Sequence, residues 1–308
     1  MPSFTLQTGF GLILLRRIAT RRLAGFLHAS AVLARFNMLK RTITGAVLVA
    51  VLVGFFFLRK LDYAFFHIAI SLIAVIGALE AVKMTGERTA LSQKITCVLS
   101  AIAVCVSFYF FNATGALVAL VIFLIAQFFI PVFARAKYGM ESLTLSLFAT
   151  IYPCGLLIPL MMINTLGGIS TFALILTFVI SPCADVFAYL VGRTLKGKKL
   201  CPEISPNKTV SGAIGGLVGG IVGSVVVYAL TKNSFNYHLN LNPYLYFAVV
   251  GLVAALLTEI GDLVESFIKR SFGVKDSGKI FPGHGGVLDR FDGLIFASVF
   301  IYFVVALF

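Results

Sequence analysis

Long apolar runs alternate with short polar segments along most of this 308-residue chain. A bilayer core of about 30 Å requires roughly 17–25 apolar residues per helix. Runs of about this length occupy residues 42–58, 63–82, 95–111, 115–134, 143–163, 171–192, 210–231, 244–267 and 293–308, the last being short enough that its helix should begin between Asp289 and Asp292. Backbone polar groups must be satisfied inside a membrane, and no strand-like alternation is visible. The pattern predicts an all-α, polytopic membrane protein with about nine transmembrane helices.

Composition indicates the same class. Hydrophobic residues make up 59% of the chain and charged residues 12%, and the mean hydropathy is +1.01, far from the values of ordinary soluble domains. No polar stretch is long enough to form a separate soluble domain. We expect residues 1–37 to form a basic arm, residues 38–170 a membrane scaffold, and residues 171–308 a catalytic region with cytoplasmic loops at 193–209 and 268–292.

The positions of the basic residues predict the orientation. With the N-terminus in the cytoplasm, fifteen Lys and Arg residues fall in the inner loops 83–94, 135–142, 193–209 and 268–292, whereas the outer loops hold only Arg59, Lys60 and Lys232. Because cytoplasmic loops carry an excess of Lys and Arg, we expect the N-terminus inside and the C-terminus outside. The charged segments then face the compartment that holds nucleotides, and the expected location is a bacterial-type plasma membrane.

The status of residues 1–37 stays open. This arm contains five arginines and no acidic residue, and Met38 resembles a second start directly before the first apolar run. A basic amphipathic surface helix, a targeting presequence and an upstream-extended start codon are alternatives. We assign the arm no function.

A net charge of +13 is compatible with nucleic-acid binding, but the Lys and Arg residues lie in short loops and do not form one face. The charge is explained better as a signal for membrane topology together with contact with anionic lipid headgroups, and we expect no nucleic-acid partner. The five cysteines are odd in number and lack the spacing of a metal site. They are expected to be reduced structural thiols.

Glycines recur at four-residue intervals in the run 210–231. One series contains Gly212, Gly216 and Gly220, and the other contains Gly215, Gly219 and Gly223. Small residues at this spacing let membrane helices approach closely. A phosphate-binding glycine loop is the alternative, but the segment lacks the Walker arrangement, so helix packing is favoured.

Carboxylates gather at the end of the run 244–267 and in the segment that follows. Glu259, Asp262, Glu265 and Ser266 lie at the predicted cytoplasmic end of that run. On a helix, Asp262 and Ser266 are one turn apart on the same face. Ionisable groups inside a membrane helix usually line a polar cavity or have a partner. An ion pair with Lys269 or Arg270 is therefore the alternative to a ligand site.

Asp289 and Asp292 lie three residues apart where the last run begins. Two carboxylates at one helix mouth suggest a cation. Mg²⁺ is commonly held by a few carboxylates together with substrate phosphates, and Asp262, Asp289 and Asp292 are candidate ligands, with Ser266 completing the site. Helix capping by Asp289 is the alternative.

The same segment carries groups suited to phosphate. Its basic residues are Lys269, Arg270, Lys275, Lys279 and Arg290. The glycines of Pro282-Gly-His-Gly-Gly286 allow backbone N–H groups to surround an anion. His284 is a candidate hydrogen-bond donor to phosphate or a general acid. A neutral histidine that braces the loop is equally compatible.

A second basic loop, residues 193–209, is predicted on the same side. Lys196, Lys198 and Lys199 are explained as well by topology as by function, whereas the polar turn containing Ser205, Asn207 and Lys208 is not needed for orientation. Asp185 is expected to be buried in the preceding apolar run. We expect both inner loops to converge on one site.

The segment from Ser266 to Asp292 resembles the signature of the phosphatidate cytidylyltransferases, also called CDP-diacylglycerol synthases. It matches S-x-x-K-R, four residues, K-D, and then H-G-G-x-x-D-R-x-D. Two further segments agree with this family, Asp185-Val-Phe-Ala-Tyr-Leu-Val-Gly-Arg193 and Ile204-Ser-Pro-Asn-Lys-Thr209. By general pattern the resemblance extends from Met38 to the end of the chain.

This resemblance implies an enzyme that makes CDP-diacylglycerol and pyrophosphate from CTP and phosphatidic acid. It also implies a homodimer and a dimetal site with Mg²⁺, in which K⁺ as a second ion stays open. The expected metal ligands are Asp262, Ser266, Asp289 and Asp292. The expected catalytic residues are Asp289, Asp262, Lys269, Arg270, Arg290 and His284. The expected nucleotide-binding residues are Lys275, Asp276, Lys279, Gly283, Gly285, Gly286, Ser205, Asn207, Lys208 and Asp185.

One position departs from the family pattern, because Val210-Ser211-Gly212 stands where members often have Trp-Glu-Gly.

Two alternative functions also stay open. A CTP-dependent polyprenol or phytol kinase would release CDP and a phosphorylated lipid. An ion-coupled transporter would use Asp185, Glu259 and Asp262 along an ion pathway. Transport leaves the charged segment from Lys269 to Asp292 unexplained.

Overall fold

A computed structural model of the protein describes residues 43–133, 139–234, 241–281 and 285–306. The chain forms two units, residues 1–51 with 282–284 and residues 52–281 with 285–308. Of the first unit only residues 43–51 are described, and they form the first half of helix Ile43–Leu58. The predicted basic arm, residues 1–37, lies outside the described residues. The site described below belongs to the second unit.

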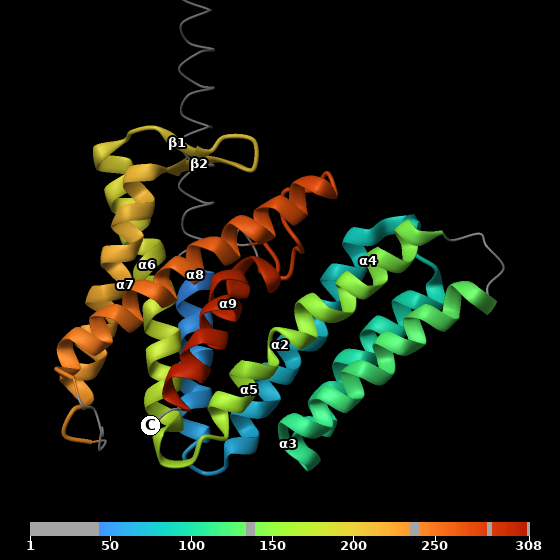
Figure 1. The fold of residues 1–308 in the computed structure, drawn as a ribbon, viewed down its shortest axis with the longest axis horizontal. Helices are drawn as coiled ribbons and strands as arrows, with labels where there is room; N and C mark the ends of the chain where they lie inside the picture. Colours follow the sequence, from blue (N-terminus) through green and yellow to red (C-terminus); the bar gives the residue numbers. More distant parts are fainter. Residues whose placement is uncertain (1–42, 134–138, 235–240, 282–284, 307–308) are drawn as a thin grey trace, which may run out of the picture. The chain divides into compact units, whose positions relative to one another are not determined.

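The second unit is built mainly of helices (Figure 1). They are α2 (Tyr63–Thr85), α3 (Leu91–Phe133), α4 (Met140–Thr150), α5 (Ile158–Asn164), α6 (Ser170–Leu195), α7 (Val210–Thr231), α8 (Pro243–Ser271) and α9 (Leu288–Val305), with short turns η1 (Gly86–Arg88), η2 (Ile151–Gly155) and η3 (Gly167–Ile169). The predicted apolar runs are helical over most of their described length. The last helix begins at Leu288, one residue before the predicted start.

Six described segments are long and apolar enough to cross a membrane. They are Tyr63–Arg88, Leu91–Phe133, Met140–Asn164, Gly167–Leu195, Val210–Thr231 and Pro243–Ser271. Ile43–Leu58 is a shorter apolar helix. These segments agree with the helical membrane protein that the sequence predicts.

The long α3 contains two of the predicted runs. The chain leaves helical geometry at Asn112, where φ is 54° and ψ is −152°, a combination that residues other than glycine rarely adopt. Gln127 in the second arm donates to the carbonyl of Gln93 in the first. The arms therefore run antiparallel, as expected for the separate runs 95–111 and 115–134.

The predicted run 143–163 is a broken helix. The π-helical turn η2, which contains Pro153, lies between α4 and α5. Proline has no N–H to donate and disturbs a regular helix. The break brings Tyr152, a buried residue, toward the charged site described below.

A two-stranded hairpin, which the sequence did not predict, follows α6 within this mainly helical fold. Strand β1 (Lys199–Cys201) pairs antiparallel with β2 (Ser205–Thr209). Both strands are too short and too polar for an alternating pattern to be visible. Thr209 then caps α7, because its Oγ1 accepts the Gly212 N–H at 3.1 Å. The hairpin thus fixes Asn207 and Lys208 at the mouth of α7.

The glycines of α7 face two neighbouring helices. A Cβ added at Gly219 would lie 2.6 Å from the Cys183 carbonyl oxygen of α6, and one at Gly220 would lie 2.6 Å from the Gly251 carbonyl oxygen of α8. Such distances leave no room for a side chain. The close helix packing predicted from the spacing is confirmed, and it brings α6 and α8 together across α7.

One apolar core joins the predicted scaffold and the predicted catalytic region. It contains Phe66 and Leu160 from the first and Phe172, Phe247 and Ile301 from the second. The predicted catalytic region is therefore packed directly against the predicted scaffold helices.

Candidate functional site

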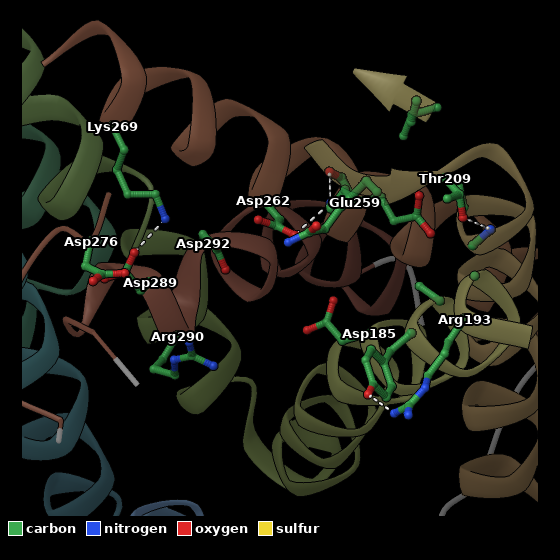
Figure 2. A pocket seen from close by; sticks show the side chains of 18 residues that line it. Asp185, Arg193, Thr209, Glu259, Asp262, Lys269, Asp276, Asp289, Arg290 and Asp292 are labelled. Carbon is green, nitrogen blue, oxygen red and sulfur yellow. Dashed lines mark hydrogen bonds and ion pairs between the residues drawn. The ribbon is translucent and has the colours of Figure 1, made fainter. Parts of the chain in front are cut away.

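A cavity of about 630 Å³ is lined by residues of α6, the hairpin, α7, α8, the segment after α8, and α9 (Figure 2). The predicted site residues that line it are Asp185, Asn207, Lys208, Asp262, Lys269, Asp276, Asp289, Arg290 and Asp292. Residues of the two loops that the sequence predicts on one side thus line one cavity. Asp185 lies within α6, as expected from its place in the apolar run, and its side chain lines this polar cavity.

The middle of the cavity contains an ion pair between β2 and α8. Lys208 Nζ lies 2.7 Å from Asp262 Oδ2. Ser266 Oγ donates to Asp262 Oδ1 at 3.4 Å, which agrees with the predicted shared helical face. One turn earlier, Glu259 is buried, and its Oε1 has no hydrogen-bond partner among the described residues. Figure 2 shows Glu259 between Asp262 and Thr209.

Lys269 lies between two carboxylates. Its Nζ is 2.6 Å from Asp289 Oδ1. It also forms an ion pair with Glu265, one turn earlier in α8. The alternative of an ion pair with Lys269 is therefore observed for Glu265, and Asp289 shares the same lysine. Because all three side chains are largely buried, each charge compensates another that would otherwise be costly to desolvate.

Asp289 also braces the loop that precedes its own helix. Its Oδ2 accepts the Ser277 N–H at 2.9 Å, the Ser277 hydroxyl at 2.9 Å and the Gly286 N–H at 2.7 Å. Burial favours a raised pKa for Asp289, but the hydrogen bonds from Lys269, Gly286 and Ser277 outweigh burial and hold its pKa below the ordinary value. Asp289 therefore stays ionised. The predicted capping alternative does not apply, because Val287 is the N-cap residue of α9.

The side chain that caps the first N–H groups of α9 is Glu80 of α2, from a distant part of the chain. Its carboxylate accepts the backbone N–H groups of Val287 and Leu288, each at 3.0 Å, and the hydroxyl of Ser277 at 3.2 Å. Glu80 is only 4% exposed. Sequence reasoning missed Glu80 and Ser277 as site residues. A lone acid inside the apolar run 63–82 was the available signal, since such groups need a partner.

Tyr152 is a second contribution from the scaffold region. Its hydroxyl is buried without a hydrogen-bond partner among the described residues. It lies within electrostatic range of Glu265, Asp292, Asp262 and Asp289. Because π-helical turns often occur at functional sites, its place in η2 adds it to the surroundings of the carboxylates. Nothing in its local sequence indicated this position.

Several predicted residues lie beside the cavity. Arg270 donates to the carbonyls of Ile204 at 3.3 Å and Val274 at 3.2 Å, and so links α8 to the hairpin. The predicted residues outside the lining are Ser205, Ser266, Arg270, Lys275, Lys279, Gly285 and Gly286. Gly285 has φ of 85° and pairs with Phe281, so its backbone shapes the turn. Gly283 and His284 lie outside the described residues.

The carboxylates have the donor chemistry of a magnesium site. Within the described ranges, no three His, Cys, Asp or Glu side chains are grouped closely enough to hold a metal ion. Asp262 is nevertheless close enough to repel the negative charge of Asp292. Two carboxylates completed by substrate phosphates and water are a common Mg²⁺ environment. The residues therefore fit a cation that binds together with a phosphate substrate.

The α6 side of the cavity contains residues that the sequence analysis did not select. Tyr189, Arg193 and Thr209 line it together with Leu200. Arg193 donates to the Tyr189 hydroxyl at 2.7 Å, and its guanidinium lies 5.9 Å from the centre of the Tyr189 ring. The available signal was the segment from Asp185 to Arg193, where these residues follow Asp185 at four-residue spacing and so share a helical face.

Comparison with known proteins identifies the family. A model described as the cytidylyltransferase family matches residues 39–308. The chain belongs to the cytidylyltransferase family. The matched range contains every predicted site residue, and its breadth does not favour the lipid-kinase or transporter alternatives.

Curated relatives carry a more specific name. A phosphatidate cytidylyltransferase of Bacillus subtilis is 40% identical over 138 residues, which are 43% of this chain and 49% of that protein. One of Brucella abortus is 39% identical over 135 residues, 44% of this chain and 47% of that protein. One of Rickettsia conorii is 37% identical over 165 residues, 53% of this chain and 69% of that protein. The match spans about half the length of the first two relatives.

Proposed function

We propose that this cytidylyltransferase acts on phosphatidic acid and CTP and produces CDP-diacylglycerol and pyrophosphate. The single observation that carries the proposal is the cavity in which Lys208 and Asp262 meet Lys269, Asp289 and Arg290 beside an apolar helical body. The names of the curated relatives support the same substrates. Transfer of a nucleotidyl group requires positioning and charge neutralisation more than covalent help from the protein.

The proposed reaction is an in-line displacement at phosphorus. A phosphate oxygen of phosphatidic acid forms a bond to the α-phosphorus of CTP, and the bond from that phosphorus to the bridging oxygen of pyrophosphate breaks. Pyrophosphate leaves with the electron pair. Lys208, Lys269 and Arg290 offset negative charge on the transferring and leaving phosphates. The phosphate monoester is already an anion near neutral pH, so the reaction requires no strong general base.

The metal site is part of this proposal. Asp262, Asp289 and Asp292 would hold Mg²⁺, with Ser266 completing the site, and K⁺ stays an open second ion. When bound, the cation would neutralise non-bridging phosphate oxygens. Lys208 and Lys269 hold the neighbouring carboxylates in place, which limits electrostatic repulsion before substrate binds. Lys275, Lys279, His284 and the backbone of the Gly283–Gly286 turn remain predicted phosphate contacts.

We also propose the membrane arrangement predicted from the sequence, with about nine spans, the N-terminus inside, the C-terminus outside and the site on the cytoplasmic face of a bacterial-type plasma membrane. The six long apolar segments and the convergence of the basic inner loops on one cavity support it. We further propose that the protein forms the homodimer implied by the resemblance. Crosslinking in membranes tests this.

The deciding experiment incubates the detergent-solubilised protein with labelled CTP, phosphatidic acid and Mg²⁺ and separates lipid and aqueous products. We expect labelled CDP-diacylglycerol and pyrophosphate, loss of turnover with EDTA, and recovery with added Mg²⁺. Release of CDP with a newly phosphorylated lipid would support the kinase alternative. Ion flux in liposomes without nucleotide consumption would support the transporter.

A further inference from the structure

We propose that Tyr189 and Arg193 bind the phosphate monoester of the lipid substrate at the α6 side of the cavity. This inference rests on the proposed function and deepens it. It assigns the α6 side of the cavity to phosphatidic acid and the side formed by α9 and the segment after α8 to the nucleotide.

The pair is preorganised for an anion. Tyr189 and Arg193 are one turn apart on α6, and the guanidinium donates to the tyrosine hydroxyl at 2.7 Å and lies 5.9 Å from the ring centre. Both side chains line the cavity (Figure 2 labels Arg193). This hydrogen bond orients the planar guanidinium, whose remaining N–H groups match the oxygens of a phosphate. The tyrosine hydroxyl is able to donate to the same anion.

Arg193 also differs from the lysines of the cavity in its partners. Lys208 is paired with Asp262, and Lys269 is paired with Glu265 and Asp289. Within the described residues Arg193 has no acidic partner, and its side chain is exposed. Its positive charge is therefore available to a ligand without breaking an existing ion pair.

The surroundings of the pair favour a lipid over a free nucleotide. Apolar residues next to the pair on α6, and others on α7, which packs against α6, are well exposed: Val186 53%, Leu190 52%, Ile214 60% and Val218 47%. Both helices are candidate membrane spans. Such surfaces lie against acyl chains in a bilayer, while a polar headgroup stays at the helix ends.

The depth of Arg193 agrees with a headgroup. It lies two residues before α6 ends at Leu195, and the polar hairpin follows. Long basic side chains at this level keep the charged group near the membrane surface. A phosphate held there has its glycerol and acyl chains directed along α6 and α7 and its free oxygens directed toward Lys208 and Asp262. The nucleotide then binds on the opposite side of the cavity, beside Asp276, Asp289 and Arg290.

Kinetics in mixed micelles test the assignment, with the mole fraction of phosphatidic acid and the CTP concentration varied separately. Arg193→Gln should raise KM for phosphatidic acid by roughly ten- to hundredfold, because a charge-assisted contact is lost. Tyr189→Phe should raise it by a smaller factor, and KM for CTP should stay within about twofold in both variants. Lys198→Gln is the matched control, since it removes one exposed charge from the neighbouring loop outside the cavity.

A binding arm separates this inference from the proposed function. Fluorescent phosphatidic acid and fluorescent diacylglycerol are titrated into the protein in micelles without CTP. Preferential binding of phosphatidic acid that is lost in Arg193→Gln supports the inference, even if no CDP-lipid is formed and the proposed function fails. An unchanged KM and unchanged binding in Arg193→Gln would overturn it. So would a rise in KM for CTP alone, an effect equal to that of Lys198→Gln, or no binding of phosphatidic acid by the wild-type protein.

Discussion

Glu80 accepts the backbone N–H of Leu288 at 3.0 Å and thereby caps α9 from α2. The first N–H groups of a helix have no partner within the helix, and a carboxylate there also interacts favourably with the helix dipole. A Cβ at Gly278 or Gly286 would overlap the Glu80 carboxylate, so both positions must be small. One acid of the scaffold region therefore fixes the start of the helix that carries Asp289, Arg290 and Asp292.

Glu80→Gln should lower kcat while the protein stays folded. The amide keeps the size of the side chain but replaces one acceptor oxygen with a donor group that faces a backbone N–H. Loss of such a buried hydrogen bond costs about 1–3 kcal/mol, and a small displacement of Asp289 and Asp292 should lower kcat about tenfold or more. Thermal unfolding in detergent and turnover per folded protein measure the two effects.

Glu141→Gln is the matched control for this substitution. Glu141 is an exposed acid whose contact with Arg88 is 4.0 Å long, so its loss should leave both measurements unchanged. Equal behaviour of the two variants would contradict a positioning role for Glu80.

Asp262 should be required for turnover beyond its ion pair with Lys208. Asp262→Asn should lower kcat about a hundredfold or more at saturating Mg²⁺, because it removes a charge next to the transferring phosphates. The Mg²⁺ concentration that gives half-maximal turnover of Asp262→Asn distinguishes a ligand from a structural partner, because loss of a ligand should raise it. An unchanged Mg²⁺ requirement would leave Asp262 only as the partner of Lys208.

Asp289→Asn should loosen the loop that Asp289 holds. The amide of Asn offers one acceptor where the carboxylate accepts from Lys269, Ser277 and Gly286, so stability should fall by about 1–3 kcal/mol. Hydrogen exchange at the Ser277 and Gly286 amides should become faster. Unchanged exchange would contradict the bracing role, and near-wild-type turnover would contradict a place for Asp289 in the catalytic site.

Gly220→Ala should destabilise the contact between α7 and α8. The added Cβ would overlap Ala255 and lie 2.6 Å from the Gly251 carbonyl oxygen, and overpacking of this kind costs about 1–3 kcal/mol. A lower midpoint of thermal unfolding is the expected result. Gly54→Ala is the control, since a Cβ there meets nothing within 4 Å. Equal midpoints for the two variants would contradict the close approach.

Sequence periodicity was sufficient for features that depend on near neighbours. The predicted run 210–231 is helix α7 with the same bounds. Asp262 and Ser266, four residues apart, are in contact as their spacing predicts. Helix geometry repeats over a few residues, so such relationships can be read directly from the chain. The hairpin 199–209 was missed because its short polar strands have no pattern of their own.

By itself, the sequence determined the membrane class, the helical runs and the charged segments that form the cavity. Only the tertiary structure decided which charges meet: Lys208 with Asp262, Lys269 with Asp289, and Glu80 with a helix start more than 200 residues later. The reason is physical. A helix forms from local backbone hydrogen bonds, whereas the partner of a buried charge depends on how the helices pack, and that packing is set by the shapes of distant side chains together.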